Sequence, residues 1–378
     1  MSLPEPVRVD RPLASHFEAN KLGIVVFGPG RGEAIVVIFP DATLGVVDGC
    51  REPSNPSGDP VRAFIEDWHR EHPQIRGRIR FVALTHPHDD HYAGLARLIT
   101  HYDESIDELW STLPSGGHYA NAYLEYMRIV NDNPDQLCED EYQGLVRMHH
   151  VLTQNTRRVQ IMQRGRYDVM MLKAKVAGRW ARVRCIAPSH GDTLHAQRDL
   201  MRALSEASTK AERPRPRHDP NLTSGALVVS WGDARALLAG DLLLGHGDYR
   251  GWDGAKSSLS ARVQVVKAAH HASAGAQDWA LWQQMAPALA IVTPFKQAKR
   301  NWPPQPGELE RLADQTRVAL TSPPEWKAPA APLRTRNSVL PITADKRVRG
   351  YDDAVGVCLD AKGTITKLVL AGRANFFG

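Results

Sequence analysis

The stretch His86-Pro87-His88-Asp89-Asp90-His91 places three imidazoles and two carboxylates within six residues. It directly follows residues 78–84, an apolar run that indicates a buried strand. Imidazole nitrogens and carboxylate oxygens suit zinc, manganese or iron, and a loop after a strand can direct alternate side chains at two neighbouring ions. The alternative, a histidine-rich surface loop without metal, is disfavoured by the sequence around the stretch. The stretch therefore predicts a dinuclear metal site.

The composition is that of a globular protein. The chain has 378 residues, of which 42% are hydrophobic and 24% charged, which excludes a disordered, collagen-like or coiled-coil protein. Its four cysteines are far apart, which argues against a zinc ribbon or a disulfide framework. No apolar run reaches the roughly 18 residues of a membrane helix, so we expect a cytoplasmic protein without a membrane partner. The net charge of +5 mildly favours an anionic partner, although arginine-rich codon usage explains it equally well.

Strand and helix patterns alternate along most of the chain and predict an α/β fold. Residues 118–165 instead carry two amphipathic helical patterns, so we interpret residues 111–166 as a helical insertion. Residues 323–378 begin with a Pro- and Ala-rich stretch and are interpreted as a linker plus a C-terminal β-hairpin that completes or decorates a sheet. We expect one domain over residues 1–378.

The metal-ligand stretch resembles the HxHxDH signature of the metallo-β-lactamase superfamily. The residues that meet this signature are His86, His88, Asp90 and His91. Residues 24–50 resemble the superfamily's opening strands, and Asp48 within them stands where its members have a carboxylate that supports the metal site. The resemblance implies an αββα sandwich, in which two mixed sheets lie face to face with helices outside and the metals at one edge.

Two later motifs extend the resemblance, in the expected order. Leu238-Ala239-Gly240-Asp241 resembles the GD motif, and His270-His271-Ala272-Ser273 resembles the HHGS motif with Ala272 in place of the glycine. Together with Asn221-Leu222-Thr223-Ser224, these motifs are similar to one branch of the superfamily. That branch contains the hydrolase domain of competence DNA-uptake proteins and the phosphorylcholine esterases, so the resemblance implies phosphodiester chemistry.

The branch also implies a ligand set for two divalent ions, Zn²⁺ or Mn²⁺. One ion would be bound by His86, His88 and Asp241. The second would be bound by Asp90, His91, Asp241 and His271, with Asp241 shared between the two ions. His270 would then face the substrate.

Two further residues are left open by the sequence. His190 lies near the place where other branches have an additional ligand, but this branch usually has a Pro-Ser turn there. Asn221 either orients the metal loop or simply caps a strand.

A dinuclear site of this type lowers the pKa of a shared water and predicts a metal-dependent hydrolase. The leading interpretation is a phosphodiesterase or nuclease acting on nucleic acid, with Asp90 and His270 as catalytic residues and His270 assisting the leaving oxygen. One alternative is a small-molecule acyl hydrolase such as a lactonase or thioesterase, which would need a deep apolar pocket. Another is a partner-gated effector subunit of a bacterial defence system, with a regulatory protein as its partner. The sequence leaves the choices between DNA and RNA and between the two metals open.

Overall fold

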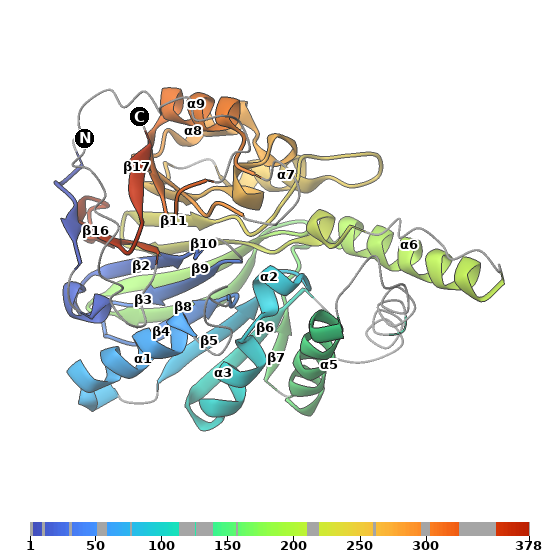
Figure 1. Ribbon diagram of the computed structural model, residues 1–378, viewed down its shortest axis with the longest axis horizontal. Helices are drawn as coiled ribbons and strands as arrows, with labels where there is room; N and C mark the ends of the chain where they lie inside the picture. Colours follow the sequence, from blue (N-terminus) through green and yellow to red (C-terminus); the bar gives the residue numbers. More distant parts are fainter. Residues whose placement is uncertain are drawn as a thin grey trace.

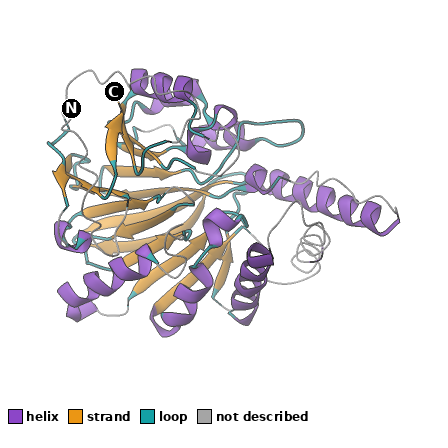
Figure 2. Cartoon of the chain, in the orientation of Figure 1, coloured by secondary structure: helices purple, strands orange, loops and turns teal. Residues whose placement is uncertain are grey.

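Two mixed β-sheets lie face to face, with helices on both outer sides (Figure 1, Figure 2). This arrangement confirms the αββα sandwich expected from the sequence. The computed structural model describes residues 3–9, 12–29, 32–50, 59–75, 78–112, 125, 139–155, 158–209, 219–259, 262–295, 303–324 and 353–377.

The first sheet has the order β1-β16-β15-β2-β3-β4-β5-β6-β7. Its strands β2, β3 and β4 are buried along their whole length, as their apolar, β-branched sequences predict. From β4 to β7 neighbouring strands run parallel, so their carboxyl ends meet at one edge. The strand bounds are β1 Val7–Arg8, β2 Leu22–Phe27, β3 Ala34–Ile38, β4 Leu44–Val47, β5 Ile79–Leu84, β6 Ile106–Ser111, β7 Val159–Ile161, β15 Ala354–Leu359 and β16 Ile365–Ala371.

The second sheet has the order β17-β14-β13-β12-β11-β10-β9-β8. Strands β11 to β14 are parallel to one another, whereas β8 to β11 form an antiparallel meander. The main core lies between the sheets, because the inward-facing side chains of both form one buried apolar cluster. The bounds are β8 Val169–Val176, β9 Arg179–Ala187, β10 Ala226–Trp231, β11 Ala234–Leu238, β12 Val265–Lys267, β13 Leu289–Val292, β14 Arg317–Leu320 and β17 Asn375–Phe377.

Helices cover the outer faces of both sheets. Apolar side chains of α1, α3 and α5 pack on the first sheet, and those of α7, α8 and α9 pack on the second. Helix α6 extends away from the sandwich (Figure 1). No helix among the described residues is both long and apolar enough to cross a bilayer. The α-helix bounds are α1 Pro60–Glu71, α2 Asp89–Tyr92, α3 Leu95–His101, α5 Glu139–Gln154, α6 His190–Thr209, α7 Gly251–Ala255, α8 Trp279–Met285 and α9 Pro306–Gln315.

Short 3-10 turns connect many of these elements. Their bounds are η1 Leu13–His16, η2 Pro73–Ile75, η3 Asp103–Ser105, η4 Pro220–Thr223, η5 Lys256–Ser258, η6 Ala269–Ala272 and η7 Ala274–Ala276.

The region interpreted as a helical insertion contains a strand as well as a helix. The second of the two expected helical patterns is α5, while the first lies outside the described residues. Strand β7 then pairs with β6 and extends the first sheet, which the sequence reading missed because a run of three residues carries too little periodicity. At the other end of the chain, β15 and β16 are integral to that sheet, since β15 pairs with β2. Residues 325–352 lie outside the described part.

Candidate metal centre

Two pairs of parallel strands, one pair in each sheet, bring the predicted site residues to one edge of the sandwich. Asp48 follows β4 and His86 follows β5, and these two strands are neighbours in the first sheet. Asp241 follows β11 and His270 follows β12, which are neighbours in the second sheet. Because the carboxyl ends of parallel strands lie at the same edge, segments far apart in the chain meet there.

One group of ligand atoms contains His86, His88 and Asp241. Nε2 of His86 lies 3.1 Å from Nδ1 of His88 and 3.9 Å from Oδ2 of Asp241. Ligand atoms about 2.0–2.1 Å from a tetrahedral ion are roughly 3.3–3.4 Å apart. These separations are therefore those of side chains able to share one ion.

A second group contains Asp90, His91 and His271, again with Asp241. Nε2 of His271 lies 3.2 Å from Oδ2 of Asp90 and 3.7 Å from Oδ2 of Asp241. Nε2 of His91 lies 3.4 Å from Oδ1 of Asp241 and 3.6 Å from Oδ2 of Asp90. Asp241 thus contacts both groups, with Oδ2 near His86 and His271 and Oδ1 near His91.

Two buried polar atoms of the two ligand groups lack hydrogen-bond partners within the part of the chain that the structure describes. They are Nε2 of His91 and Oδ1 of Asp241, which face each other. Polar groups buried without partners are costly, and a cation between this nitrogen and this oxygen would satisfy both. The donor set, imidazole and carboxylate, and the orphaned atoms therefore fit divalent metal ions.

Asp48 supports the site from behind His91. Its carboxylate accepts hydrogen bonds from the backbone N–H of Thr85 at 2.7 Å, from the Thr85 hydroxyl at 2.7 Å and from Nδ1 of His91 at 2.8 Å. A proton on Nδ1 of His91 leaves the lone pair on Nε2, the atom that faces Asp241. Asp48 therefore connects His91 with Thr85, the residue directly before His86.

Ser224 links the GD motif to the first histidine. Its Oγ accepts the backbone N–H of Asp241 at 2.9 Å and lies 3.3 Å from Nδ1 of His86. Gly240 has φ +50, and a Cβ there would lie 2.6 Å from that same Oγ. Only glycine accommodates both the backbone conformation and this close approach. A glycine at position 240 therefore allows Ser224 to hydrogen-bond to Asp241 and places the Asp241 carboxylate near His86.

Charge in the cluster is balanced between imidazoles and carboxylates. Burial alone would lower the pKa of His91, but Asp241, Asp90 and Asp48 raise it well above its usual range. Burial alone would raise the pKa of Asp241, but the neighbouring histidines hold it well below its usual range. Burial instead dominates at His86, where it lowers the pKa well below the ordinary value. The cluster holds charged carboxylates, which favours binding of cations.

A buried ion pair behind His271 was missed by sequence reasoning. Lys267 and Glu33 are both fully buried and form a close salt bridge. The Thr293 hydroxyl donates to Glu33 at 2.7 Å, while Nδ1 of His271 donates to the Thr293 backbone carbonyl at 2.8 Å. The available signals in the sequence were Lys267 at the end of one apolar strand and Glu33 just before another. Charged side chains in such positions are buried only when they are paired, so each indicates a buried partner.

Glu33 also lies close enough to be considered as a ligand. An oxygen of Glu33 and ligand atoms of His91, Asp241 and His271 all lie within 4.8 Å of one another. However, Oε2 of Glu33 is paired with Lys267 and is 3.7 Å from Nδ1 of His271, the nitrogen that faces away from the other ligands. Oε1 of Glu33 is buried and has no hydrogen-bond partner among the described residues, but Oε2, which is held by Lys267, is the oxygen beside His271, so we assign Glu33 to the support of His271.

His270 lies at the rim of the cluster. It is 29% exposed, compared with 3% for His271, and its Nε2 is 3.8 Å from Oδ2 of Asp241. Ser273 Oγ contacts its Nδ1 at 3.0 Å, and Asn221 Nδ2 lies 3.3 Å from its Nε2. Both histidines and Ala272 have positive φ values, a conformation that non-glycine residues adopt at a cost. The contact with Nε2 makes Asn221 a direct neighbour of the His270 ring.

The structure places His190 differently from the other candidates. It is the first residue of α6, is exposed and contacts the side chain of Gln163. Within the described residues, none of its hydrogen bonds reaches the metal-binding cluster.

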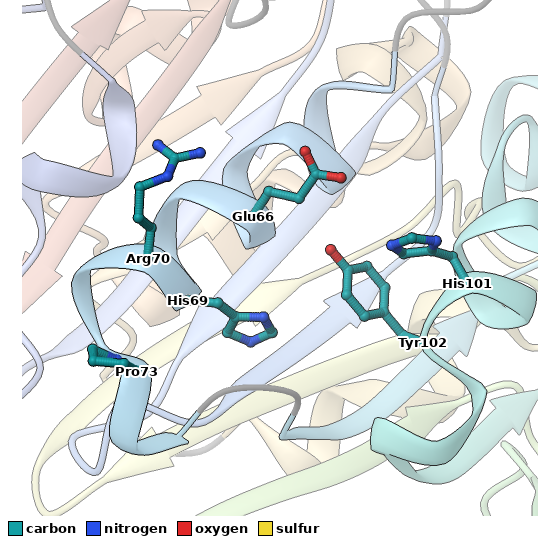
Figure 3. A pocket seen from close by; sticks show the side chains of 6 residues that line it. All are labelled: Glu66, His69, Arg70, Pro73, His101 and Tyr102. Atoms are coloured by element: carbon teal, nitrogen blue, oxygen red, sulfur yellow. The ribbon is translucent and has the colours of Figure 1, made fainter.

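A cavity of about 590 Å³ lies between α1 and α3, away from these residues (Figure 3). It is lined by Glu66, His69, Arg70, Pro73, His101 and Tyr102. None of these side chains belongs to the candidate metal centre. The cavity is therefore not the apolar pocket beside the metals that an acyl hydrolase would need.

No protein-family model and no curated protein matches this chain. Solved structures with some similarity include Igni18, a metallo hydrolase from the archaeon Ignicoccus hospitalis, with 10% identity, a TM-score of 0.37, and coverage of 78% of this chain and 94% of that one. YhfI from Bacillus subtilis, a metallo-β-lactamase fold protein, has 9% identity, a TM-score of 0.37, and coverage of 79% and 96%. The long form of RNase Z from yeast has 10% identity, a TM-score of 0.36, and coverage of 76% and 39%. These likenesses are weak and assign no substrate to this chain.

Proposed function

We propose that this chain is a dinuclear metal-dependent hydrolase of the metallo-β-lactamase superfamily that cleaves phosphodiester bonds in nucleic acid. The observation that carries the proposal is the convergence of the HxHxDH, GD and HHxS residues at one sheet edge, at spacings suited to shared ions. The orphaned buried atoms of His91 and Asp241 support it, because a cation would satisfy both. The residues proposed to hold the ions are His86, His88, Asp90, His91, Asp241 and His271.

Two divalent ions, Zn²⁺ or Mn²⁺, would supply an activated water and offset the charge of the attacked phosphate. The protein's part is to hold the ligands in place. Asp48 fixes the orientation of His91, Ser224 connects His86 with Asp241, and the Thr293 carbonyl fixes the orientation of His271. Asp90 is proposed as a ligand that also borders the substrate, because its carboxylate is the more exposed of the two aspartate ligands.

His270 is proposed to assist the departure of the leaving oxygen. Its exposure and its position at the rim give it access to a substrate, while Ser273 and Asn221 restrain its ring. Burial lowers the pKa of His270 from its usual value, which favours the neutral ring. In the tautomer with the proton on Nε2, the nitrogen on the side of Asp241, this N–H would be the donor to a leaving oxygen.

Cleavage of labelled single- and double-stranded DNA and RNA with added Mn²⁺, Zn²⁺ or Mg²⁺ tests the proposal. Cleavage that disappears in an Asp90→Ala/His91→Ala variant would support a metal-dependent nuclease. If the wild-type chain holds two metals but cuts none of these substrates, the nuclease proposal is wrong. Hydrolysis of lactones and thioesters, and a search for an activating partner protein, would then be the next assays.

A further inference from the structure

The outer face of the second sheet changes character along its strands. Near the metal edge its outward side chains, such as Val228 and Leu237, are buried with the helices that cover them. Farther from that edge the outward positions are occupied by cations and one exposed aromatic side chain. We call this set the sheet-face cluster; its members are Lys173, Lys175, Trp180, Arg182 and Arg235.

The strand register aligns three of these cations in a row. Lys173 on β8 is directly opposite Arg182 on β9, which is opposite Ser230 on β10, which is opposite Arg235 on β11. Side chains at directly opposed positions point to the same face, and like charges placed so are destabilising. The row crosses four strands, a span of about 14 Å at roughly 4.8 Å per strand.

The cations of the sheet-face cluster have no acidic partners among the described residues. Their neighbour Arg184 is paired with Asp168, whereas no carboxylate of the described chain lies within salt-bridge distance of Lys173, Lys175 or Arg182. The same holds for Arg235 over the same residues. A face with repelling, uncompensated positive charges is complementary to a polyanion.

Trp180 adds an aromatic surface to the positive charge. Its side chain is 44% exposed, and Nζ of Lys173 lies 4.7 Å from its ring centroid. Proteins that bind single-stranded nucleic acid combine cations for the phosphates with aromatic rings on which bases stack. An exposed tryptophan within a row of unpaired cations matches that chemistry. Binding of an acidic protein surface would use the cations but would not require the exposed aromatic ring.

We propose that the sheet-face cluster binds a single-stranded segment of nucleic acid that flanks the cleaved bond. This inference rests on the proposed function, because it names how the substrate is held. On β9, Arg182 and Trp180 lie five and seven residues from Ala187, whose partner on β10 is Ala226, close to Ser224 at the metal centre. At about 3.3 Å per residue the cluster is roughly 17–23 Å from that edge. The cluster therefore contacts nucleotides beyond the scissile one.

The test compares two triple variants that remove equal charge. The first is Lys173→Gln/Lys175→Gln/Arg182→Gln. The matched control, Arg62→Gln/Arg70→Gln/Arg97→Gln, removes three exposed cations from α1 and α3, which cover the other sheet. Binding of a labelled single-stranded oligonucleotide of about 20 nucleotides is measured by fluorescence anisotropy at several salt concentrations, with Asp90→Ala present throughout so that the strand stays intact.

We expect the sheet-face variant to bind at least about tenfold more weakly and to show a shallower salt dependence, because fewer phosphates are neutralised. The control should stay within about twofold of the parent, and Trp180→Ala should weaken binding of single strands more than of duplexes. Equal affinities for both triple variants would overturn the proposal. The proposal would also be overturned if the parent bound anionic vesicles but no oligonucleotide, and the sheet-face variant lost the vesicle binding.

Hydrolysis of bis(p-nitrophenyl) phosphate by chains without Asp90→Ala separates this inference from the proposed function. This small diester does not reach the sheet-face cluster, so both triple variants should hydrolyse it as the wild type does. If the wild type hydrolyses it but binds no oligonucleotide, the cluster proposal is wrong and the phosphodiesterase proposal stands. If oligonucleotide binding depends on the cluster but no diester is cleaved, the proposed function fails and the cluster proposal stands.

Discussion

Nδ1 of His91 donates a 2.8 Å hydrogen bond to the carboxylate of Asp48. Asp48 directly follows β4, and His91 lies in α2, the short helix after the neighbouring strand β5. This single contact determines which nitrogen of His91 faces Asp241. The backbone N–H and hydroxyl of Thr85 bind the same carboxylate, so Asp48 also anchors the start of the histidine-rich loop. Asp48 is therefore a positioning residue: it contacts Nδ1 of His91, whereas the opposite ring nitrogen, Nε2, faces Asp241.

Asp48→Asn should weaken metal binding by about 10- to 100-fold, because an amide cannot accept all three hydrogen bonds and leaves His91 less well oriented. Competition with a chromophoric chelator measures the affinity. Asp41→Asn is a matched control, since Asp41 is a carboxylate paired with Arg80 away from the cluster. Equal metal affinity in the two variants would contradict the role given to Asp48.

Glu33→Gln and Lys267→Met should each lower the free energy of unfolding by about 3–5 kcal/mol, because each leaves one fully buried charge unpaired. The double variant should recover much of this loss, since it removes both charges. Chemical denaturation measures the free energies. Metal analysis of the double variant tests the assignment of Glu33: two ions per chain are expected, and a loss of one ion would identify Glu33 as a ligand.

His270→Ala should keep both metal ions and lose turnover by about 100-fold or more, because proton transfer or hydrogen bonding to a leaving group typically contributes that much. The loss should be larger for substrates with a poor alkoxide leaving group than for those with a p-nitrophenolate. Steady-state kinetics on both substrate types measure the difference. Full turnover on both would rule out the role proposed for His270.

The metal-free protein should be most stable near about pH 6.5. Burial opposes charging of His91 and His271, but Asp241 and its neighbours raise the pKa of both, so their stabilisation is present below the unfolded value of about 6.5 and is lost as the pH rises. Burial lowers the pKa of His86, so its stabilisation is present above about 6.5 and is lost as the pH falls.

Thermal unfolding of chelator-treated protein from about pH 5 to about pH 9 measures this dependence. Metal affinity should rise over the upper part of the range, because a bound ion must replace the protons on His91 and His271. An unfolding temperature and a metal affinity that both stay constant across the range would contradict the arrangement of charges described for the cluster.

The residues proposed as ligands could be found in the sequence because they stand in short motifs directly after apolar strands. His86 to His91 form one contiguous stretch, and the GD and HHxS residues follow β11 and β12. The buried pair of Glu33 and Lys267 could not be predicted in the same way. Its members are 234 positions apart, and only the fold shows that each is the other's partner. A charged residue beside an apolar strand signals a buried partner without identifying it.

Two further features, strand β7 and the sheet-face cluster, depend on pairing between strands and could not be predicted from local sequence. Strand β7 is three residues long and exists because β6 offers it an edge to pair with, which is a tertiary effect. The sheet-face cluster likewise depends on register, since Lys173, Arg182 and Arg235 come from three strands. In the sequence they are ordinary cations of alternating strands.

The most direct test is a metal titration of the chelator-treated wild-type chain, with cleavage of a labelled oligonucleotide followed at each step and bound metal measured by elemental analysis. We expect no cleavage without metal and a rise in activity that saturates at two Zn²⁺ or Mn²⁺ ions per chain, with no activity in the Asp90→Ala/His91→Ala variant. A chain that binds no metal, or that cleaves equally well without it, would contradict the account.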